Sequence, residues 1–203
     1  TIDNQVLSLG RGPEDAIFEG PKGISRSMEG YPVAHFYGYQ VIGVYQNKED
    51  VKRYYPNKVG SPAPGDLKFK DVNGDGVITQ DDRTMIGNPT PDLTYGFNVN
   101  LEYRNFDLGV DMMGVYGNEV YRTWDDPTYA QLNYLTSRMN RWHGEGTSNW
   151  EPILNPSRAL NLLNSNYFIE DGSFFRIRNV QLGYKLYLAL LSKLHLKSLR
   201  LYA

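Results

Sequence analysis

The stretch TYGFNVNLEYRNFDLGVDMMGVY, residues 94–116, decides the fold class of this chain. Apolar and polar residues alternate strictly from Tyr95 to Tyr103, and the alternation resumes with the opposite parity from Phe106. A period of two on both sides of the break at 104–105 predicts a β-hairpin with arms of about ten residues. One face would carry aromatic and aliphatic side chains, and the other would carry Asn, Glu and Asp.

Two environments fit such a hairpin. In a soluble sandwich, the apolar face packs into a core and the polar face meets water. In an outer-membrane barrel, the apolar face meets lipid, and the spanning strands have about 9–11 residues. The arm length and the tyrosines at the strand ends, Tyr95, Tyr103 and Tyr116, favour a lipid-facing strand with girdles of aromatic residues. The alternation alone leaves both interpretations open and slightly favours the soluble one.

Three further segments predict β-strands. Residues 36–45 are rich in aromatic and β-branched residues, and residues 174–186 and 196–202 alternate apolar with polar. Between the last two segments, leucines at 188, 191 and 194 predict a short helical connection.

The connections alternate between short and long. The breaks at 104–105 and 187–195 are short, whereas those at 46–91 and 117–170 are long. Outer-membrane barrels have short periplasmic turns and long extracellular loops, so this order favours the barrel. It places the break at 104–105 on the periplasmic side and the two long segments, including 71–82 and 126–150, outside the cell.

Each long connection contains a segment with local order. The first predicts a helical turn at 49–55 and a strand-like stretch at 66–70. In the second, Asp126 and Pro127 suit an N-cap and a first helical residue. An amphipathic helix is expected there from the apolar residues Tyr129, Leu132, Leu135, Met139 and Trp142.

Composition excludes several classes of function. The 203 residues have a net charge of -2, which offers no electrostatic footprint for nucleic acid. The absence of cysteine excludes disulfides, thiolate metal sites and cysteine nucleophiles, and the three histidines are widely separated. No stretch approaches the roughly 20 apolar residues of a membrane-spanning helix.

The sharpest local motif is DVNGDGVITQDD, residues 71–82. It matches the D-x-[DN]-x-[DN]-G calcium loop, in which alternate residues of a tight turn direct oxygens at a hard cation. The expected ligands are Asp71, Asn73, Asp75, the carbonyl of Val77, and Asp82. Asp82 stands where an EF-hand carries a bidentate Glu, and the alternative is an Asx-rich turn that binds nothing.

Catalysis is not expected from this sequence. It contains no nucleophile elbow and no phosphate-binding glycine loop. The pairs 81–82 and 125–126 supply adjacent carboxylates, but neighbours on a strand point to opposite faces, and Asp126 already suits a cap.

Three tryptophans, Trp124, Trp142 and Trp150, lie in the segment 117–170. On an outer loop, such rings can stack on sugars or contact a partner protein. The alternative is that they pack the loop against itself.

The order of short motifs resembles the C-terminal part of the SusC/RagA family of TonB-dependent outer-membrane transporters of Bacteroidetes. The motifs are FYGY (36–39), GVY (43–45), GDLKFKDVNGDG (65–76), DRTMIGNP (82–89), PDLTYGF (91–97), RWHGEG (141–146), YFIEDGSFFRIRNV (167–180) and LGY (182–184). The resemblance covers nearly the whole chain, 1–203. It implies a fragment of a 22-stranded antiparallel barrel, whose plug, TonB box and most other strands would lie upstream, and which would continue past residue 203.

The resemblance also implies a function. The parent would import glycans or peptides across the outer membrane with energy from TonB, under a SusD-type surface lipoprotein as a lid, and would not be an enzyme. A calcium ion at 71–82 would brace a loop, and Trp124, Trp142 and Trp150 would contact the lid or the substrate. The competing hypothesis is a secreted β-rich module that binds calcium and carbohydrate, although a second calcium-type loop, as in dockerins, is absent from the sequence.

Overall fold

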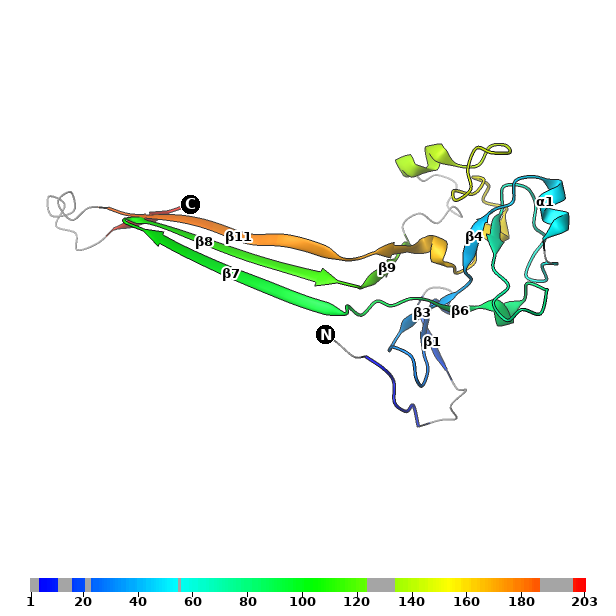
Figure 1. Cartoon of the computed structure of the whole chain (residues 1–203), viewed down its shortest axis with the longest axis horizontal. Helices are drawn as coiled ribbons and strands as arrows, with labels where there is room; N and C mark the ends of the chain where they lie inside the picture. The colour runs from blue at the N-terminus through cyan, green and yellow to red at the C-terminus, as the bar shows by residue number, and fades with distance from the viewer. Residues whose placement is uncertain (1–3, 11–15, 21–22, 55, 124–133, 187–198) are drawn as a thin grey trace. The chain divides into compact units, whose positions relative to one another are not determined.

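The computed structural model describes residues 4–10, 16–20, 23–54, 56–123, 134–186 and 199–203 (Figure 1). The chain divides into two compact units. One, the strand unit, is built from 91–118 and 172–203, and the other, the loop unit, from 4–90 and 119–171.

The strand unit is one antiparallel sheet in the order β12-β11-β8-β7. Its strands are β7 (Leu93–Tyr103), β8 (Phe106–Tyr116), β11 (Phe174–Lys185) and β12 (Arg200–Tyr202). Figure 1 shows β7, β8 and β11 as long strands that run side by side. The prediction of a hairpin over 94–116 is confirmed, and the two later strands are confirmed with β12 shorter than expected.

The hairpin register explains the change of parity at the break. Tyr103 pairs with Phe106, so only two residues form the turn, and Arg104 adopts the left-handed conformation, with φ of 54°. Two-residue hairpin turns require positive φ because that twist matches the twist of the strands. The parity change therefore keeps the alternating apolar side chains of both arms, from Tyr95 to Tyr103 and from Phe106 to Met112, on one face.

A β-bulge in β11 has the same effect on the parity of the apolar residues. The register between β8 and β11 shifts between Ile177 and Asn179, so Ile177 pairs with Met112 and Val180 pairs with Val110. An extra residue in one strand reverses the parity of all later residues in that strand. Ile177 and Val180 therefore lie on the same face, although their sequence positions have opposite parity.

The loop unit contains short strands in three sheets. A four-stranded sheet has the order β1-β2-β3-β6, and two pairs are β4-β5 and β10-β9. The strands are β1 (Ile17–Glu19), β2 (Ser25–Ser27), β3 (His35–Gly38), β4 (Val41–Val44), β5 (Leu67–Phe69), β6 (Thr84–Gly87), β9 (Glu119–Tyr121) and β10 (Ile169–Asp171). The helical elements are α1 (Lys48–Arg53) and the 3-10 turns η2 (Gln80–Asp82), η3 (Thr136–Asn140), η4 (Ala159–Leu162) and η5 (Asn166–Phe168).

The core of the loop unit joins residues that are far apart in the sequence. Its buried members are Tyr39, Val41, Val44, Leu67, Phe69, Ile78, Leu160, Tyr167 and Phe168. Tyr39 stacks on Phe69 at 4.8 Å between ring centroids. Because so few residues lie in regular elements, this cluster holds the loops in place.

Two predictions in this unit are corrected. Residues 36–45 do not form one strand, because Tyr39 leaves the sheet, donates its N–H to the carbonyl of Asn164, and separates β3 from β4. The described part of the expected helix at 127–142 contains only the 3-10 turn η3, since Trp142 is held in a loop by its N–H to the carbonyl of Glu151. Asp126, Pro127, Tyr129 and Leu132, and the leucine-rich connection at 188–194, lie outside the described residues.

The helical turn predicted at 49–55 is confirmed as α1, which Asn47 caps by accepting a hydrogen bond from the N–H of Asp50. The expected strand before the 71–82 loop is β5. Among the described residues, no helix has the length and apolar character that crossing a membrane requires.

Candidate functional surfaces

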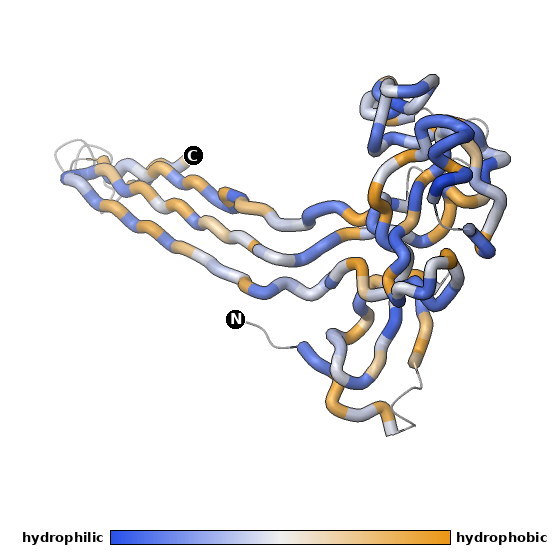
Figure 2. Tube along the Cα trace, turned by 45° about the vertical axis from the view of Figure 1, so that its right-hand side comes forward, coloured by the Kyte–Doolittle hydropathy of each residue, from blue (hydrophilic) through white to orange (hydrophobic). Residues whose placement is uncertain are grey.

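The strand unit exposes one continuous apolar face. Side chains on it come from all four strands and are at least one-third exposed: Phe97, Val99, Leu101, Tyr103, Phe106, Ile177, Val180, Leu182 and Leu201. Cross-strand pairs such as Val99 with Val110 and Leu182 with Leu108 place them in rows. Figure 2 shows hydrophobic and hydrophilic residues alternating along these strands. An exposed apolar area of this extent marks an interaction surface.

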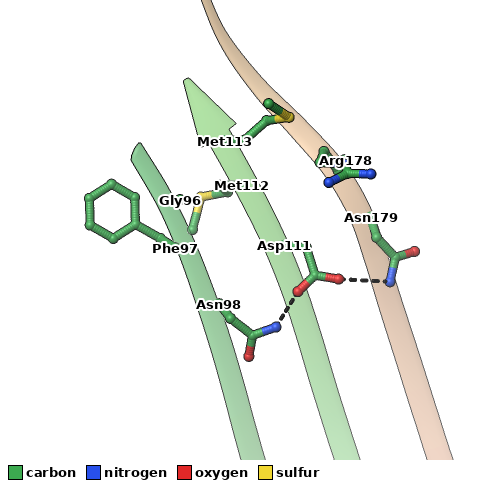
Figure 3. Close-up of a pocket in the computed structure, with 8 residues that line it drawn as sticks. All are labelled: Gly96, Phe97, Asn98, Asp111, Met112, Met113, Arg178 and Asn179. Carbon is green, nitrogen blue, oxygen red and sulfur yellow. Dashed lines mark hydrogen bonds between the residues drawn. The ribbon is translucent and has the colours of Figure 1, made fainter. Parts of the chain in front are cut away.

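The opposite face carries a row of polar side chains that bond to one another across three strands. Asp111 of β8 accepts from the amide of Asn98 in β7, and from that of Asn179 in β11 at 3.5 Å (Figure 3). Asn100 in turn donates to the carbonyl oxygen of the Asn98 side chain. Each of these amides thus has a hydrogen-bond partner within the row.

A shallow cavity of about 620 Å³ lies along this row. It is lined by Gly96, Phe97, Asn98, Asp111, Met112, Met113, Arg178 and Asn179. Arg178 is the residue that the bulge in β11 leaves without a partner in the strand register. Gly96 leaves open space beside Met112, since a Cβ there would meet only the Met112 carbonyl, at 3.6 Å. The cavity offers carboxylate, amide and guanidinium groups, which suit polar ligands.

A second polar contact lies at the other end of the same face. Asp107 of β8 forms an ion pair with Arg200 of β12. Both residues project on the side opposite to Phe106 and Leu108, which agrees with the alternation of a strand. One face of the sheet is therefore apolar. The other carries bonded polar groups from Asn98 to Arg200, and Met113, Val115 and Phe174 at its other end.

The 71–82 loop closes through its own carboxylates. Asp71 accepts from the N–H groups of Gly74 at 2.7 Å and Gly76 at 2.8 Å. Asp75 accepts from the N–H of Val77 at 2.8 Å, and Asn73 from that of Asp75 at 2.9 Å. These are the short-range bonds of a tight Asx-rich loop.

Asp82 lies at the centre of the loop and is fully buried. Its carboxylate accepts from the N–H groups of Val72 at 2.8 Å and Thr79 at 2.7 Å. Burial raises the pKa of Asp82, but these backbone donors outweigh it and hold the pKa below its ordinary value.

The donor atoms of the 71–82 loop are all oxygens, which suit a hard cation. Oxygens of Asp71, Asn73, Asp75, Val77 and Asp82 are the ligand type that calcium prefers. The described residues contain no group of three or more His, Asp or Glu gathered for a metal, so a site here needs the amide of Asn73 and the carbonyl of Val77 as well.

Of the three tryptophans, two lie within the described residues. Trp142 packs against the core of the loop unit, and Trp150 is 47% exposed with its ring 6.0 Å from that of Tyr167. Trp124 lies outside the described residues. Of the two described tryptophans, Trp150 is therefore the one whose side chain is accessible to a ligand or a partner.

A buried charged network was not predicted. Arg138 of η3, 5% exposed, donates to Glu151 at 3.2 Å and also to the hydroxyl of Tyr167. The same Tyr167 hydroxyl donates to Glu151 at 2.7 Å, and burial raises the pKa of Tyr167. Residues 138, 151 and 167 follow no local motif, so nothing in the sequence identified them.

The groups weighed for catalysis are separated by their surroundings. Asp81 is exposed and Asp82 is buried, so the two do not share a site. His35 is buried, its Nδ1 lies 3.0 Å from the carbonyl of Pro32, and its ring stacks on Tyr31. Asp125 and Asp126 lie outside the described residues.

The chain is similar to curated TonB-dependent receptors over most of its length. TonB-dependent receptor P3 of Formosa agariphila is 34% identical over 179 residues, which cover 86% of this chain and 17% of the relative. TonB-dependent receptor SusC of Bacteroides thetaiotaomicron is 27% identical over 182 residues, which cover 89% of this chain and 17% of the relative. The chain thus spans about a sixth of the length of these relatives. No protein-family model matches the chain.

Solved structures share the fold. A chain of the RagAB peptide importer in its open-open state matches with a TM-score of 0.68 at 21% identity, covering 98% of this chain and 20% of that one. The closed-closed state of the same importer matches with a TM-score of 0.60 at 20% identity. The prediction of an all-β, antiparallel fold is confirmed, and so is the resemblance to SusC and RagA.

Proposed function

The chain belongs to the SusC/RagA family of TonB-dependent receptors, as a segment about a sixth of their length, and we propose that it forms part of the outer-membrane wall of a nutrient importer. In this proposal, the strand unit crosses the membrane with its apolar face in lipid and its polar face toward the interior. The loop unit lies on the extracellular side.

The observation that carries the proposal is the two-faced sheet. Strands β7 and β8 have 11 residues each, and β11 has 12. A spanning strand needs about 9–11 residues with an outward apolar band. Tyr103 and Tyr116 lie at strand ends and are 69% and 62% exposed, as rings of an interfacial girdle would be. In a soluble module, the nonpolar face would need a covering layer, and the described residues of the strand unit form a single sheet without one.

Fractionation of the source cells tests this proposal. An antibody against this segment should detect, in the outer membrane, a band several-fold larger than 23.2 kDa whose gel mobility shifts on boiling. A soluble or secreted band near 23 kDa would overturn the proposal and favour the alternative, a secreted calcium-binding carbohydrate-binding module. If the band lies in the outer membrane, loss of growth on one class of nutrient after deletion of the receptor would identify glycan or peptide as the imported substrate.

A SusD-type lipoprotein is the partner that we propose for the extracellular side, with TonB acting from the other side of the membrane. Exposed apolar side chains of the loop unit support a protein contact: Trp150, Tyr134, Leu135 and Met139, the last 74% exposed. Trp142 packs against the core of the loop unit, and Trp142 and Trp124 are the other two tryptophans that we propose for the contact. Copurification of the lipoprotein with the receptor, and its loss on Trp150→Ala, would test the contact.

Calcium at the 71–82 loop is a second proposal, with a structural role. The arrangement of its carboxylates supports it, because Asp71 and Asp82 both accept from backbone N–H groups of the same tight loop. The ion would be held by Asp71, Asn73, Asp75, Asp82 and the carbonyl of Val77. Calcium should slow proteolysis within 71–82 of the intact receptor, and Asp71→Asn should abolish that protection. Equal cleavage with calcium and with chelator would contradict the proposal.

A further inference from the structure

The loop unit contains a groove of about 600 Å³. Segments that are distant in sequence line it, namely Tyr39, the stretch after residue 57, η2 with the residues beside it, and the end of η4. The lining residues are Tyr39, Lys58, Val59, Thr79, Gln80, Asp81, Arg83, Leu162, Leu163 and Asn164.

The groove has rigid backbone on two sides. The N–H of Lys58 donates to the carbonyl of Ile78 at 2.9 Å, and the N–H of Ile78 donates to the carbonyl of Pro56 at 2.8 Å. Ile78 is fully buried in the core of the unit. On the facing side, the carbonyl of Asn164 accepts from the N–H of Tyr39 at 2.9 Å. The walls are therefore held by the core rather than by the groove's own side chains.

The rim of the groove carries two cations without a counter-ion. In the described part of the chain, neither Lys58 nor Arg83 has a carboxylate within ion-pair distance. Arg83 is oriented by its Nε, which donates to the carbonyl of Gln80 at 3.1 Å, and by the ring of Tyr37, 5.4 Å from its guanidinium carbon. Its terminal nitrogens retain donors suited to a planar, two-oxygen acceptor.

The floor is aliphatic rather than aromatic. Leu162, Leu163 and Val59 supply half-buried apolar surface, whereas Tyr39 is only 4% exposed. Because the one aromatic side chain of the lining is buried, the groove offers no ring face on which a neutral sugar could stack. Recognition must then come from the cations on the rim and the apolar floor.

We propose that this groove binds a carboxylate-bearing ligand, with the carboxylate on Arg83 and Lys58 and the apolar or weakly polar body on Leu162, Leu163 and Val59. Asp81 is exposed at the rim and repels the same carboxylate, which limits affinity and favours release. As a site for the imported nutrient, the groove rests on the proposed function. As an anion site, it does not depend on membrane insertion.

Binding to the purified full-length receptor tests the proposal with two pairs of probes. Tri-leucine with a free carboxyl terminus is compared with its amide, and tri-galacturonate is compared with its methyl ester. The acidic member of one pair should bind at least about tenfold more tightly than its neutral partner, since a charge-assisted hydrogen bond contributes that much. The pair that discriminates identifies whether a peptide or an acidic sugar supplies the carboxylate.

Substitutions separate this groove from other cationic sites. Arg83→Gln combined with Lys58→Gln should abolish the preference for the acid, and Asp81→Asn should tighten its binding several-fold. Lys52→Gln, on the exposed side of α1, is the matched control and should leave binding unchanged. The proposal is overturned if neither acid is preferred, or if the preference survives the double substitution. Outer-membrane fractionation of the same variants reports separately on the proposed function.

Discussion

Arginine at Val99 should block assembly of the receptor in the outer membrane. Val99 lies in the interior of β7 and pairs with Val110 on the apolar face. Tyr103, the last residue of β7, is four positions further along. At about 3.3 Å per residue and a tilt of about 40°, four positions correspond to roughly 10 Å along the membrane normal. If Tyr103 lies at the interface, Val99 therefore lies close to the middle of an apolar band about 25 Å tall.

The position of each residue sets the expected cost. A lipid-facing arginine costs about 2–4 kcal/mol at the midplane and about 0–1 kcal/mol near the interface. Val99→Arg should thus lower the equilibrium constant of assembly by roughly 30-fold to nearly a thousandfold, whereas Tyr103→Arg should lower it by about fivefold or less. The assay is the heat-modifiable band of the full-length receptor in isolated outer membranes, compared with total receptor in the cell.

Asn100 provides the matched control, because it neighbours Val99 in sequence and projects from the polar face. Asn100→Arg replaces one hydrogen bond to Asn98 and should assemble normally. The reasoning is refuted if Asn100→Arg fails while Val99→Arg assembles, or if arginine at Val99 and at Tyr103 has the same effect. Either result would mean that the apolar face does not meet lipid.

Three further predictions concern the loop unit of the intact receptor. Arg138→Ala should raise hydrogen exchange around its partner Glu151 by an amount equivalent to at most about 3–5 kcal/mol, because the Glu151 carboxylate loses its counter-ion and keeps only the Tyr167 hydroxyl; unchanged exchange would show that the pair is solvated. Gly65→Ala should destabilise the same region by about 1–3 kcal/mol, the cost of a strained backbone site. The φ of Gly65 is +90°, and the new Cβ would lie 2.6 Å from the ring of Trp142. A proteolysis pattern equal to that of the parent would contradict this prediction. Burial, with a smaller contribution from Arg26, lowers the pKa of His35, so the neutral ring is favoured in the folded state. The stability it contributes is full above the ordinary value of 6.5 and is lost as pH falls through the lowered pKa; exchange in the β1-β2-β3-β6 sheet, corrected for intrinsic rates, should rise at acid pH in the parent and not in His35→Gln.

The strand unit could be predicted from the sequence because its information is local. Alternation over ten or more residues specifies both the strand and its two faces, and the break at 104–105 specifies the turn. Even the bulge left a signal, since the apolar parity changes between Ile177 and Val180. Periodicity could not decide the environment of the apolar face. The alternation of connection lengths and the ordered motifs favour lipid, and that environment stays a prediction.

The loop unit could be predicted only in pieces, because its structure depends on contacts between distant residues. Residues 36–45 have the composition of one strand, yet Tyr39 bonds to Asn164, and the N–H of Val41 donates to the side chain of Asn166 at 2.8 Å. The spacing at 135, 139 and 142 suits a helix, but Arg138 turns inward to Glu151. Tertiary contacts override local preference in both places.

The open edge of the sheet at β7 bears on the proposed position of the strand unit in the membrane. Among the described residues, β7 pairs only with β8, so the other edge of an 11-residue strand presents unpaired backbone groups. In hydrocarbon, each such group costs several kcal/mol, which no gain from the apolar face could offset over a whole strand. Contact of the apolar face with lipid therefore requires a further strand beside β7. The parts of the receptor beyond this segment are the source that we propose for it, and a disulfide between cysteines introduced in β7 and in that strand would establish the pairing.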